Sequence, residues 1–218
     1  MDRRSAISTP GDRVYQAIKA GIIAYSFPQG QRIYLQPLAD ALGVSTTPVR
    51  EALNRLAAED LVIKAPRKGF TAMRLSRDNV LGYYELTRLL LARELEGLSP
   101  AGRQKLPEFE PVAGVLFKLN RRVLTDVNTL ARYTGEVFFD IASVGEKPHA
   151  MRSISHANDH LHYIRTVECR HLENVQDELK LLCELVLSGR SDDLLKAIHT
   201  YHDKRVEALP ALFELAKR

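Results

Sequence analysis

The sequence predicts a mainly α-helical protein of two domains: an N-terminal winged helix-turn-helix with a small β-hairpin, and a C-terminal all-α helical bundle. Two observations predict this fold class. Short helical patterns followed by two short strand patterns occupy the first third of the chain, and patterns with a period near 3.6 residues follow. We therefore expect one domain over residues 8–75 and another over residues 76–218.

Composition is that of a globular protein, with 218 residues, of which 45% are hydrophobic and 27% charged. No apolar run reaches the roughly 18 residues that a transmembrane helix needs, so we expect no membrane association. The basic N-terminus lacks the apolar core of a signal peptide. Two cysteines are too few for a disulfide framework, which favours the cytoplasm. The net charge of +4 weakly favours an anionic partner.

The first helical pattern covers residues 12–25, where apolar residues recur at the spacing of one helix face. Pro28 and Gly30 end this helix because both residues break helical patterns. A second, short helix fits residues 36–42. Gly43 follows it and permits the sharp turn that a helix-turn-helix needs.

A third helix is predicted to begin at Thr47. A hydroxyl at the N-cap followed by proline at the first helical position, here Pro48, is a helix-start signal. The apolar stripe of this helix consists of Val49, Ala52, Leu53 and Leu56. Arg50 lies off that stripe and should therefore be exposed.

Two short strands are predicted at residues 61–63 and 70–73, joined by a loop that contains proline and glycine. The segment after Leu61 carries only cationic charges, up to Arg74. A cationic strip beside a helix is what contact with phosphate groups requires. This hairpin would be the wing of the winged helix-turn-helix.

Helical patterns follow from Ser76 almost to the end of the chain, with no convincing strand pattern beyond residue 74. Breaks fall at residues 99–100, 107–111, 144–148 and 188–191. We therefore expect about six helices that pack as a bundle.

The order helix, turn, helix, hairpin predicts a DNA-binding domain. The second helix of such a motif enters the major groove, so its N-terminal turn should carry small polar or cationic residues. Residues 45–50 read Ser-Thr-Thr-Pro-Val-Arg, with hydroxyls and free N–H groups at a positive helix end. The predicted wing tip, Arg67-Lys68-Gly69, is cationic.

The string LADALGVSTTPVREALNRLAAEDLVIKAPRKGF resembles the GntR family of bacterial transcription regulators almost throughout. With the helix before it, the resemblance covers about a third of the chain. It implies that seven residues occupy DNA-contacting positions: Gln36, Ser45, Thr46, Thr47, Arg50, Lys68 and Gly69. The family often has arginine where this chain has Thr46, so the family's operator sequence does not carry over.

The helical domain is similar to that of the FCD (fatty-acid-regulator-like) subfamily. This resemblance implies a bundle that holds a small-molecule effector, often a carboxylate, between its helices. Four polar residues expected to face inward are the effector-binding candidates: Arg88, Asp140, Arg165 and His202.

Many members of this subfamily bind a metal ion with one aspartate and three histidines, a ligand set suited to zinc or a similar divalent ion. Here Glu136 and Asp140 stand in place of the aspartate and the first histidine, and Glu178 in place of the second. Only His202 matches. These four residues are the metal-ligand candidates, and no cofactor is certain. A second group comprises His156, His160, His162 and His171, but it lacks a third fixed ligand.

The sequence therefore favours a ligand-responsive transcription regulator, more often a repressor in this family. It would act as a homodimer on a palindromic operator in double-stranded DNA. The alternative is a DNA-binding protein whose helical domain only dimerises and binds no effector or metal. An enzyme is not favoured, since neither a nucleophile–base pair nor a competent metal site is visible.

Overall fold

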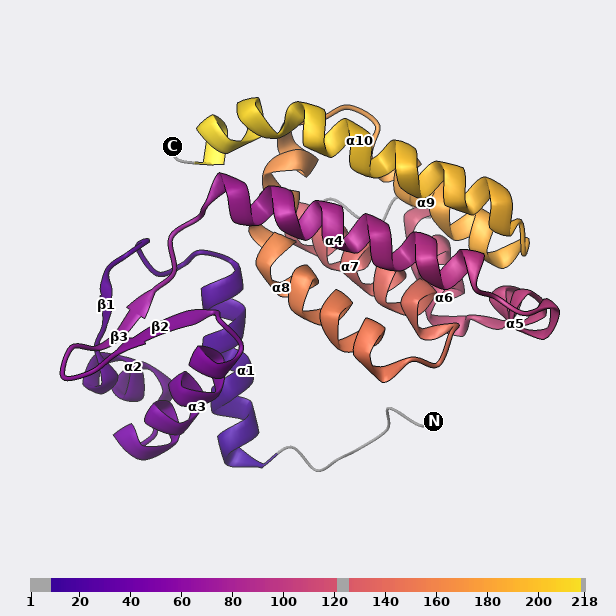
Figure 1. Cartoon of the computed structure of the whole chain (residues 1–218). Coiled ribbons are helices and arrows are strands. Elements are labelled where there is room, and N and C mark those ends of the chain that lie inside the picture. Colours follow the sequence, from indigo (N-terminus) through magenta and orange to yellow (C-terminus); the bar gives the residue numbers. More distant parts are fainter. Residues whose placement is uncertain (1–8, 121–125, 217–218) are drawn as a thin grey trace. The chain divides into compact units, whose positions relative to one another are not determined.

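The computed structural model describes residues 9–120 and 126–216, and it divides the chain into two compact units between Leu75 and Ser76 (Figure 1). The fold class predicted from the sequence is confirmed. All the strands among the described residues lie in the first unit, and the second unit is helical.

The N-terminal unit contains α1 (Pro10–Ile23), β1 (Arg32–Ile33), α2 (Leu35–Leu42), α3 (Thr46–Ala58), β2 (Val62–Ala65) and β3 (Gly69–Ala72). The strands form an antiparallel sheet in the order β1-β3-β2, so the predicted hairpin has a third strand on its other side. A capping box starts α1, because the Thr9 hydroxyl accepts a hydrogen bond from the Asp12 N–H at 3.1 Å.

A single apolar cluster holds the helices and the sheet of this unit together. Its buried members are Val14, Tyr15, Ile18, Ile22, Ile33, Ala39, Val49, Ala52, Leu53, Leu56, Leu61, Val62, Phe70 and Ala72. All four stripe residues of the third predicted helix belong to it. The cluster therefore fixes which side of α3 faces outward.

The start of α3 differs from the prediction by two positions. The N-cap is Ser45, and the helix begins at Thr46, so Thr47 lies in the first turn and Pro48 is the third helical residue. Proline is tolerated there because the first-turn N–H groups have no intrahelical acceptor. Gly43 ends α2 in the left-handed conformation, with φ of 66°.

The second unit contains α4 (Arg77–Glu96), α5 (Pro100–Lys105), the 3₁₀ helix η1 (Leu106–Glu108), α6 (Glu110–Asn120), α7 (Val127–Ser143), α8 (Pro148–His171), α9 (Val175–Leu187) and α10 (Ser191–Ala216). The described residues of this unit thus form seven α-helices, where about six were expected. The sequence did not indicate the break between α8 and α9, where Asn174 adopts a left-handed φ of 62°. None of the described helices is both long and apolar enough to cross a membrane.

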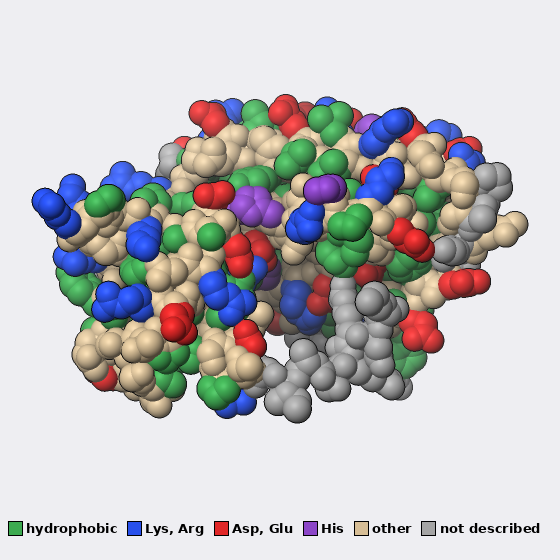
Figure 2. Space-filling view, turned by 60° about the horizontal axis from the view of Figure 1, so that its bottom comes forward, with side chains coloured by type: hydrophobic (Ala, Val, Ile, Leu, Met, Phe, Trp, Pro, Cys, Tyr) green, Lys and Arg blue, Asp and Glu red, His purple; other side chains and the backbone are tan. Residues whose placement is uncertain are grey.

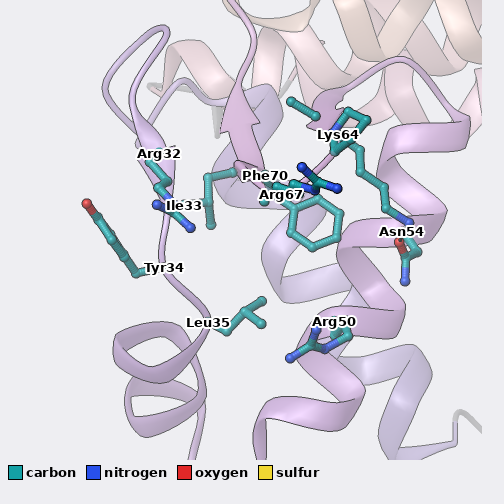
Figure 3. A pocket seen from close by; sticks show the side chains of 12 residues that line it. Arg32, Ile33, Tyr34, Leu35, Arg50, Asn54, Lys64, Arg67 and Phe70 are labelled. Atoms are coloured by element: carbon teal, nitrogen blue, oxygen red, sulfur yellow. Dashed lines mark hydrogen bonds between the residues drawn. The ribbon is translucent and has the colours of Figure 1, made fainter.

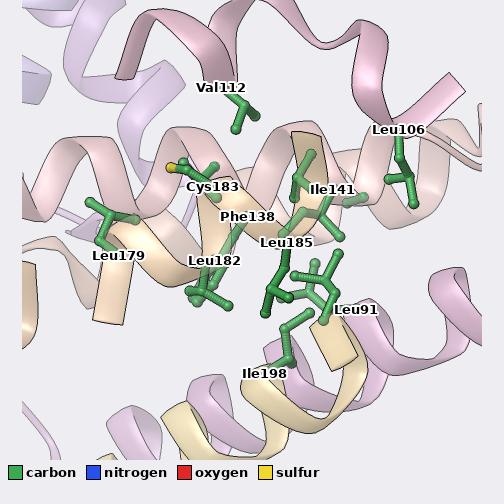
Figure 4. Packing of buried hydrophobic residues seen from close by; sticks show 14 of the residues in the cluster. Leu91, Leu106, Val112, Phe138, Ile141, Leu179, Leu182, Cys183, Leu185 and Ile198 are labelled. Atoms are coloured by element: carbon green, nitrogen blue, oxygen red, sulfur yellow. The ribbon is translucent and has the colours of Figure 1, made fainter. Parts of the chain in front are cut away.

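The core of the second unit is mainly apolar, with Leu91, Phe138, Ile141, Leu182 and Ile198 among its members (Figure 4). These residues come from α4, α7, α9 and α10, so the long helices share one core. This packing fixes the helices that carry the buried polar residues described below.

Candidate nucleic-acid interface

Helix α3 buries one face and exposes the other. Val49, Leu53 and Leu56 are each 0% exposed, whereas Arg50 lies on the exposed side. The Arg50 side chain makes no ion pair and no side-chain hydrogen bond with any residue that the structure describes. Its guanidinium donors are therefore available to an external acceptor, as contact with a base edge requires.

The N-terminal turn of α3 also has unused donors. Ser45 is the N-cap, but its hydroxyl makes no capping hydrogen bond. Thr47 is exposed, and Thr46 is half-buried beside it. Hydroxyls and free N–H groups at the positive end of a helix suit an anion or a base edge, so this turn can contact DNA.

The wing tip is a tight, cationic turn. Ala65 and Gly69 pair across the hairpin, and the Lys68 N–H donates to the Ala65 carbonyl at 3.2 Å. Arg67 and Gly69 both adopt left-handed conformations, with φ of 62° and 80°. Because the chain turns in this way, the Arg67 and Lys68 side chains are exposed at the tip.

Strand β1 adds Arg32 to this surface, which the sequence did not indicate. Arg32 pairs with Thr71 of β3 and lies over the ring of the exposed Tyr34, 5.5 Å from its centroid. A Cβ atom at Gly69 would lie 3.5 Å from Arg32 Nη2. The third strand thus brings a further cation next to the wing.

A groove of about 560 Å³ runs between α3, β1 and the wing (Figure 3). Arg32, Arg50, Lys64 and Arg67 all line it, while the Phe70 ring lies among them. Each of these cations comes from a different part of the domain, so the fold brings them together. Figure 2 shows Lys and Arg side chains gathered over the N-terminal domain.

Asn54 and Lys64 were also missed by the sequence reasoning. Both line the groove, and Lys64 Nζ donates to Asn54 Oδ1 at 2.7 Å. Asn54 lies one helical turn after Arg50, so the helical spacing could have predicted that it shares the exposed face of α3. The position of Lys64, in contrast, depends on how the hairpin folds back toward α3. The pair extends the groove along α3.

Two polar residues on these helices bind within the protein instead. Gln36 Nε2 donates to Asp40 Oδ1 at 2.7 Å, although its side chain remains exposed. Arg55 binds Asp12 at 3.0 Å and stacks over the Tyr15 ring, 3.9 Å from its centroid. Arg55 therefore ties α3 to α1, and Arg50 is the uncommitted arginine of this helix.

The helical domain contains a buried polar cluster. Arg165, Glu168, His202 and Arg205 are each 1% exposed. Glu168 accepts a hydrogen bond from the Tyr84 hydroxyl and another from Arg205 Nε at 3.3 Å. The cluster joins α4, α8 and α10.

Arg205 was not predicted from the sequence, although it lies at the centre of these contacts. It also binds Glu178 and lies over the Tyr201 ring, 3.7 Å from its centroid. Burial lowers the pKa of Arg205, but Tyr201 and the two carboxylates outweigh burial and raise it above its usual value. The Arg205 guanidinium is therefore charged and fixed.

The four effector-binding candidates do not share one environment. Asp140, Arg165 and His202 are buried, in agreement with the expected inward direction. Arg88 instead forms a salt bridge with Asp203 at 2.8 Å, and its side chain is 34% exposed. The sequence-predicted set thus separates into three core residues and one surface residue.

The four metal-ligand candidates do not fit a metal ion. Glu136 is paired with Arg132, and Glu178 is paired with Lys204 and Arg205. Over residues 9–120 and 126–216, no group of three or more His, Cys, Asp or Glu side chains gathers as a metal site requires. Arginines pair with Glu136 and Glu178, so the expected ligand set does not come together among the described residues.

The predicted histidine group packs instead against an aromatic ring. Tyr83 makes a 3.1 Å hydrogen bond with His156 Nε2, and its ring stacks on His160 with centroids 4.6 Å apart. His171 is exposed at the end of α8. Burial and the charges of Arg165 and Arg132 lower the pKa of His162 to about 4.

The N-terminal domain matches a known family, and two curated regulators are similar to longer parts of the chain. Residues 10–71 match the model of the bacterial regulatory proteins of the gntR family. The "Nta operon transcriptional regulator" of Aminobacter aminovorans is 24% identical over 180 residues, which are 83% of this chain and 84% of that protein. The "HTH-type transcriptional regulator McbR" of Escherichia coli is 33% identical over 108 residues, 47% of this chain and 49% of the relative.

Solved structures are similar over both domains. A GntR-type protein from Rhodococcus sp. RHA1 superposes with a TM-score of 0.70 at 17% identity, over 92% of this chain and 97% of the other. Escherichia coli McbR/YncC superposes with a TM-score of 0.61 at 18% identity, over 93% and 98%. At these identities the likeness shows a shared fold.

Proposed function

We propose that this chain, whose residues 10–71 form a DNA-binding domain of the gntR family, is a sequence-specific transcription regulator that recognises DNA through α3 and the wing. The observation that carries the proposal is the uncommitted Arg50, held on the exposed face of α3 beside the cationic groove. Arginine donating to guanine O6 and N7 is the commonest specific base contact. In this proposal Ser45, Thr46 and Thr47 contact the same stretch of DNA.

The wing and the recognition helix have different roles in this proposal. Lys68 and Gly69, together with Arg67 and Arg32, would bind the sugar–phosphate backbone and fix the position of α3. Gln36 would reach the backbone from the start of α2. Such contacts give affinity without sequence information, and they weaken as salt concentration rises.

We further propose that the protein is a homodimer and acts on a short palindrome. One recognition helix reads only a few base pairs, so two copies related by twofold symmetry are needed to specify an operator. The helical domain, proposed as an FCD-type domain, would hold the two copies together and respond to a small-molecule effector. Repression in the cytoplasm is the outcome that the family resemblance favours.

Selection of binding sites from a random library of DNA duplexes tests this function. The full-length protein should enrich an inverted repeat and bind it far more tightly than a shuffled duplex at the same salt concentration. Sedimentation of the complex should give two chains per duplex. Enrichment of no motif, with equal affinity for both duplexes, would contradict sequence-specific regulation.

A helical domain that only dimerises is the second candidate. It is favoured by Glu136 and Glu178, whose carboxylates are paired with arginines, so the described residues hold no metal site for an effector to share. In that case operator binding should not respond to any small molecule.

A further inference from the structure

Asn54 is held by Lys64 in one orientation on α3. Lys64 Nζ donates to Asn54 Oδ1 at 2.7 Å, and both side chains line the groove that also contains Arg50 (Figure 3). An ammonium group has no acceptor, so the amide oxygen of Asn54, rather than its nitrogen, must face Lys64. The chemistry of the pair therefore fixes the orientation of the amide.

The amide nitrogen of Asn54 has no acceptor in the described part of the chain. The only side-chain hydrogen bond of Asn54 with a described residue is the one that Oδ1 accepts from Lys64. Helical spacing places Asn54 on the same side of α3 as Arg50, whose guanidinium is also uncommitted. The N–H groups of Asn54 thus remain available beside the side chain that is proposed to contact a base.

Lys64 is restrained by two elements although its side chain is exposed. It pairs with Phe70 of β3 across the hairpin, and its Nζ lies 6.0 Å from the centre of the Phe70 ring. The hydrogen bond to Asn54 holds the same ammonium group against α3. A phosphate contact needs no such restraint, because a flexible lysine at the wing tip, such as Lys68, can follow the DNA backbone. The restraint of Lys64 therefore favours a contact with a base edge.

Together the two side chains present hydrogen-bond donors to a partner. Asn54 Oδ1 is occupied by one hydrogen of the ammonium group, which leaves the other hydrogens of Lys64 and those of Asn54 Nδ2. Among the four bases, guanine alone presents two acceptors, O6 and N7, in the major groove. Adenine and cytosine present an amino group there, which is itself a donor, and thymine presents one acceptor. A pair that only donates therefore selects guanine.

We propose that Asn54 and Lys64 read a second guanine in each half-site of the operator, beside the guanine that Arg50 contacts. Four residues of a helix span about 6 Å, and base pairs are stacked about 3.4 Å apart. The second guanine should therefore lie within about two base pairs of the first. This inference rests on the proposed recognition of DNA through α3, and it adds a specificity-determining pair to that interface.

An asparagine without the lysine would prefer a different base. A free asparagine amide donates and accepts at once, so it pairs with N6 and N7 of adenine. Lys64 prevents this pairing because it occupies Oδ1. Removal of the ammonium group should therefore change the preferred base from guanine to adenine. Loss of a phosphate contact, in contrast, would weaken binding to every sequence alike.

Selection of binding sites from random duplexes, carried out with full-length wild-type protein and with Lys64→Met, tests the proposal. Methionine has a similar length but no donor, so it releases Asn54 Oδ1. The wild-type protein should enrich guanine at the proposed position, and Lys64→Met should enrich adenine there. Lys68→Met makes the same chemical change at the wing tip and should leave the preferred bases unchanged. An unchanged preference with Lys64→Met, or the same shift with Lys68→Met, would overturn the proposal.

A modified operator tests the contact itself. Replacement of the second guanine by 7-deazaguanine, which lacks the N7 acceptor, should weaken wild-type binding roughly tenfold. The double variant Asn54→Ala, Lys64→Met should show no such loss. Equal weakening of both proteins, or of neither, would contradict the contact. Enrichment at the position read by Arg50 should persist in every variant, which shows that each is folded. A palindrome without the second guanine would sink this inference alone, whereas selection of no motif would sink the proposed function.

Discussion

Arg50 in the N-terminal domain and Arg165 in the helical domain both lack an acidic partner among the described residues, but Arg50 is exposed and Arg165 is 1% exposed. An exposed arginine keeps its hydration, so the absence of an ion-pair partner costs little free energy. A buried arginine has already lost its hydration, so its charge depends on the groups packed around it, here Asn158 and the Phe138 ring. The same side chain is therefore open to an external partner in one domain and held by the core in the other.

The surroundings of the two arginines agree with this difference. Arg50 lies beside other cations, including Arg67 and Arg32, along an open groove. Arg165 lies near a histidine whose Nε2 is an acceptor and beside an asparagine that orients it. Cations at an open surface interact with a partner in a way that depends on salt, whereas polar groups in a core are oriented by specific hydrogen bonds within the fold.

The largest expected effect is a loss of stability when the buried ion pair of Glu168 and Arg205 is broken. Glu168→Gln should lower the free energy of unfolding of the helical domain by about 3–5 kcal/mol, because it removes a charge that Arg205 needs in the core. Urea denaturation followed by circular dichroism measures this loss. Glu173→Gln, at an exposed position in the turn between α8 and α9, is the control and should change little. Equal stability of the two variants would contradict the account of the core.

A smaller effect, on DNA binding, is expected when the exposed Arg50 is changed. Arg50→Ala should weaken binding to the selected operator by about 1–3 kcal/mol and should relax base preference at one position of each half-site. Arg55→Ala, five residues later, removes an ion pair with Asp12 and should leave base preference unchanged. Binding titrations of the two protein variants against operators that differ by single base pairs measure the base preference at each position. Loss of base preference with Arg55→Ala instead would reverse the roles assigned to the two arginines.

The burial of His162 should also make the stability of the helical domain depend on pH. The pKa of His162 is lowered to about 4 by burial and by Arg165 and Arg132, whereas the ordinary value is 6.5. Between pH 4 and pH 6.5 the unfolded chain binds more protons at His162 than the folded chain does. The contribution of neutral His162 to the free energy of unfolding is therefore fully present above pH 6.5 and is lost as pH falls toward 4. The slope is at most about 1.4 kcal/mol per pH unit for one histidine. His162→Gln should reduce this slope in urea denaturation between these two pH values, and the exposed His171→Gln should not.

The smallest effect concerns the wing. Lys68→Ala should weaken DNA binding by a similar factor on every sequence, because a phosphate contact carries no base information. The slope of log affinity against log salt should fall by about 0.9, which corresponds to one phosphate contact. Binding measured over a salt series gives this slope. An unchanged slope would place Lys68 outside the interface.

Local patterns were enough to predict most of the N-terminal domain. The apolar stripe of α3 and the hairpin are set by neighbouring residues, so both were predicted. Strand β1 was not, because two residues form no pattern and their partners, Thr71 and Phe70, are far along the chain. The N-cap was misplaced since Ser45 and the two threonines after it can all act as helix caps.

The helical domain was predicted as a bundle, but its polar core was predicted only in part. Arg165 and His202 were effector candidates and Glu178 was a metal-ligand candidate, while Arg205 and Glu168 were not predicted. The cluster joins α4, α8 and α10, and no spacing within one helix shows which helices meet. Glu178 was therefore interpreted as a metal ligand, whereas tertiary packing brings it to Arg205.

The proposed regulator recognises its operator mainly through α3, which would contact base edges in the major groove. Protection of guanine N7 from methylation, measured on the selected operator, tests this directly because N7 faces that groove. The wild-type protein should protect guanines at symmetric positions in the two half-sites, and Arg50→Ala should lose this protection at equal occupancy. Undiminished protection with Arg50→Ala, or none with the wild-type protein, would contradict the account.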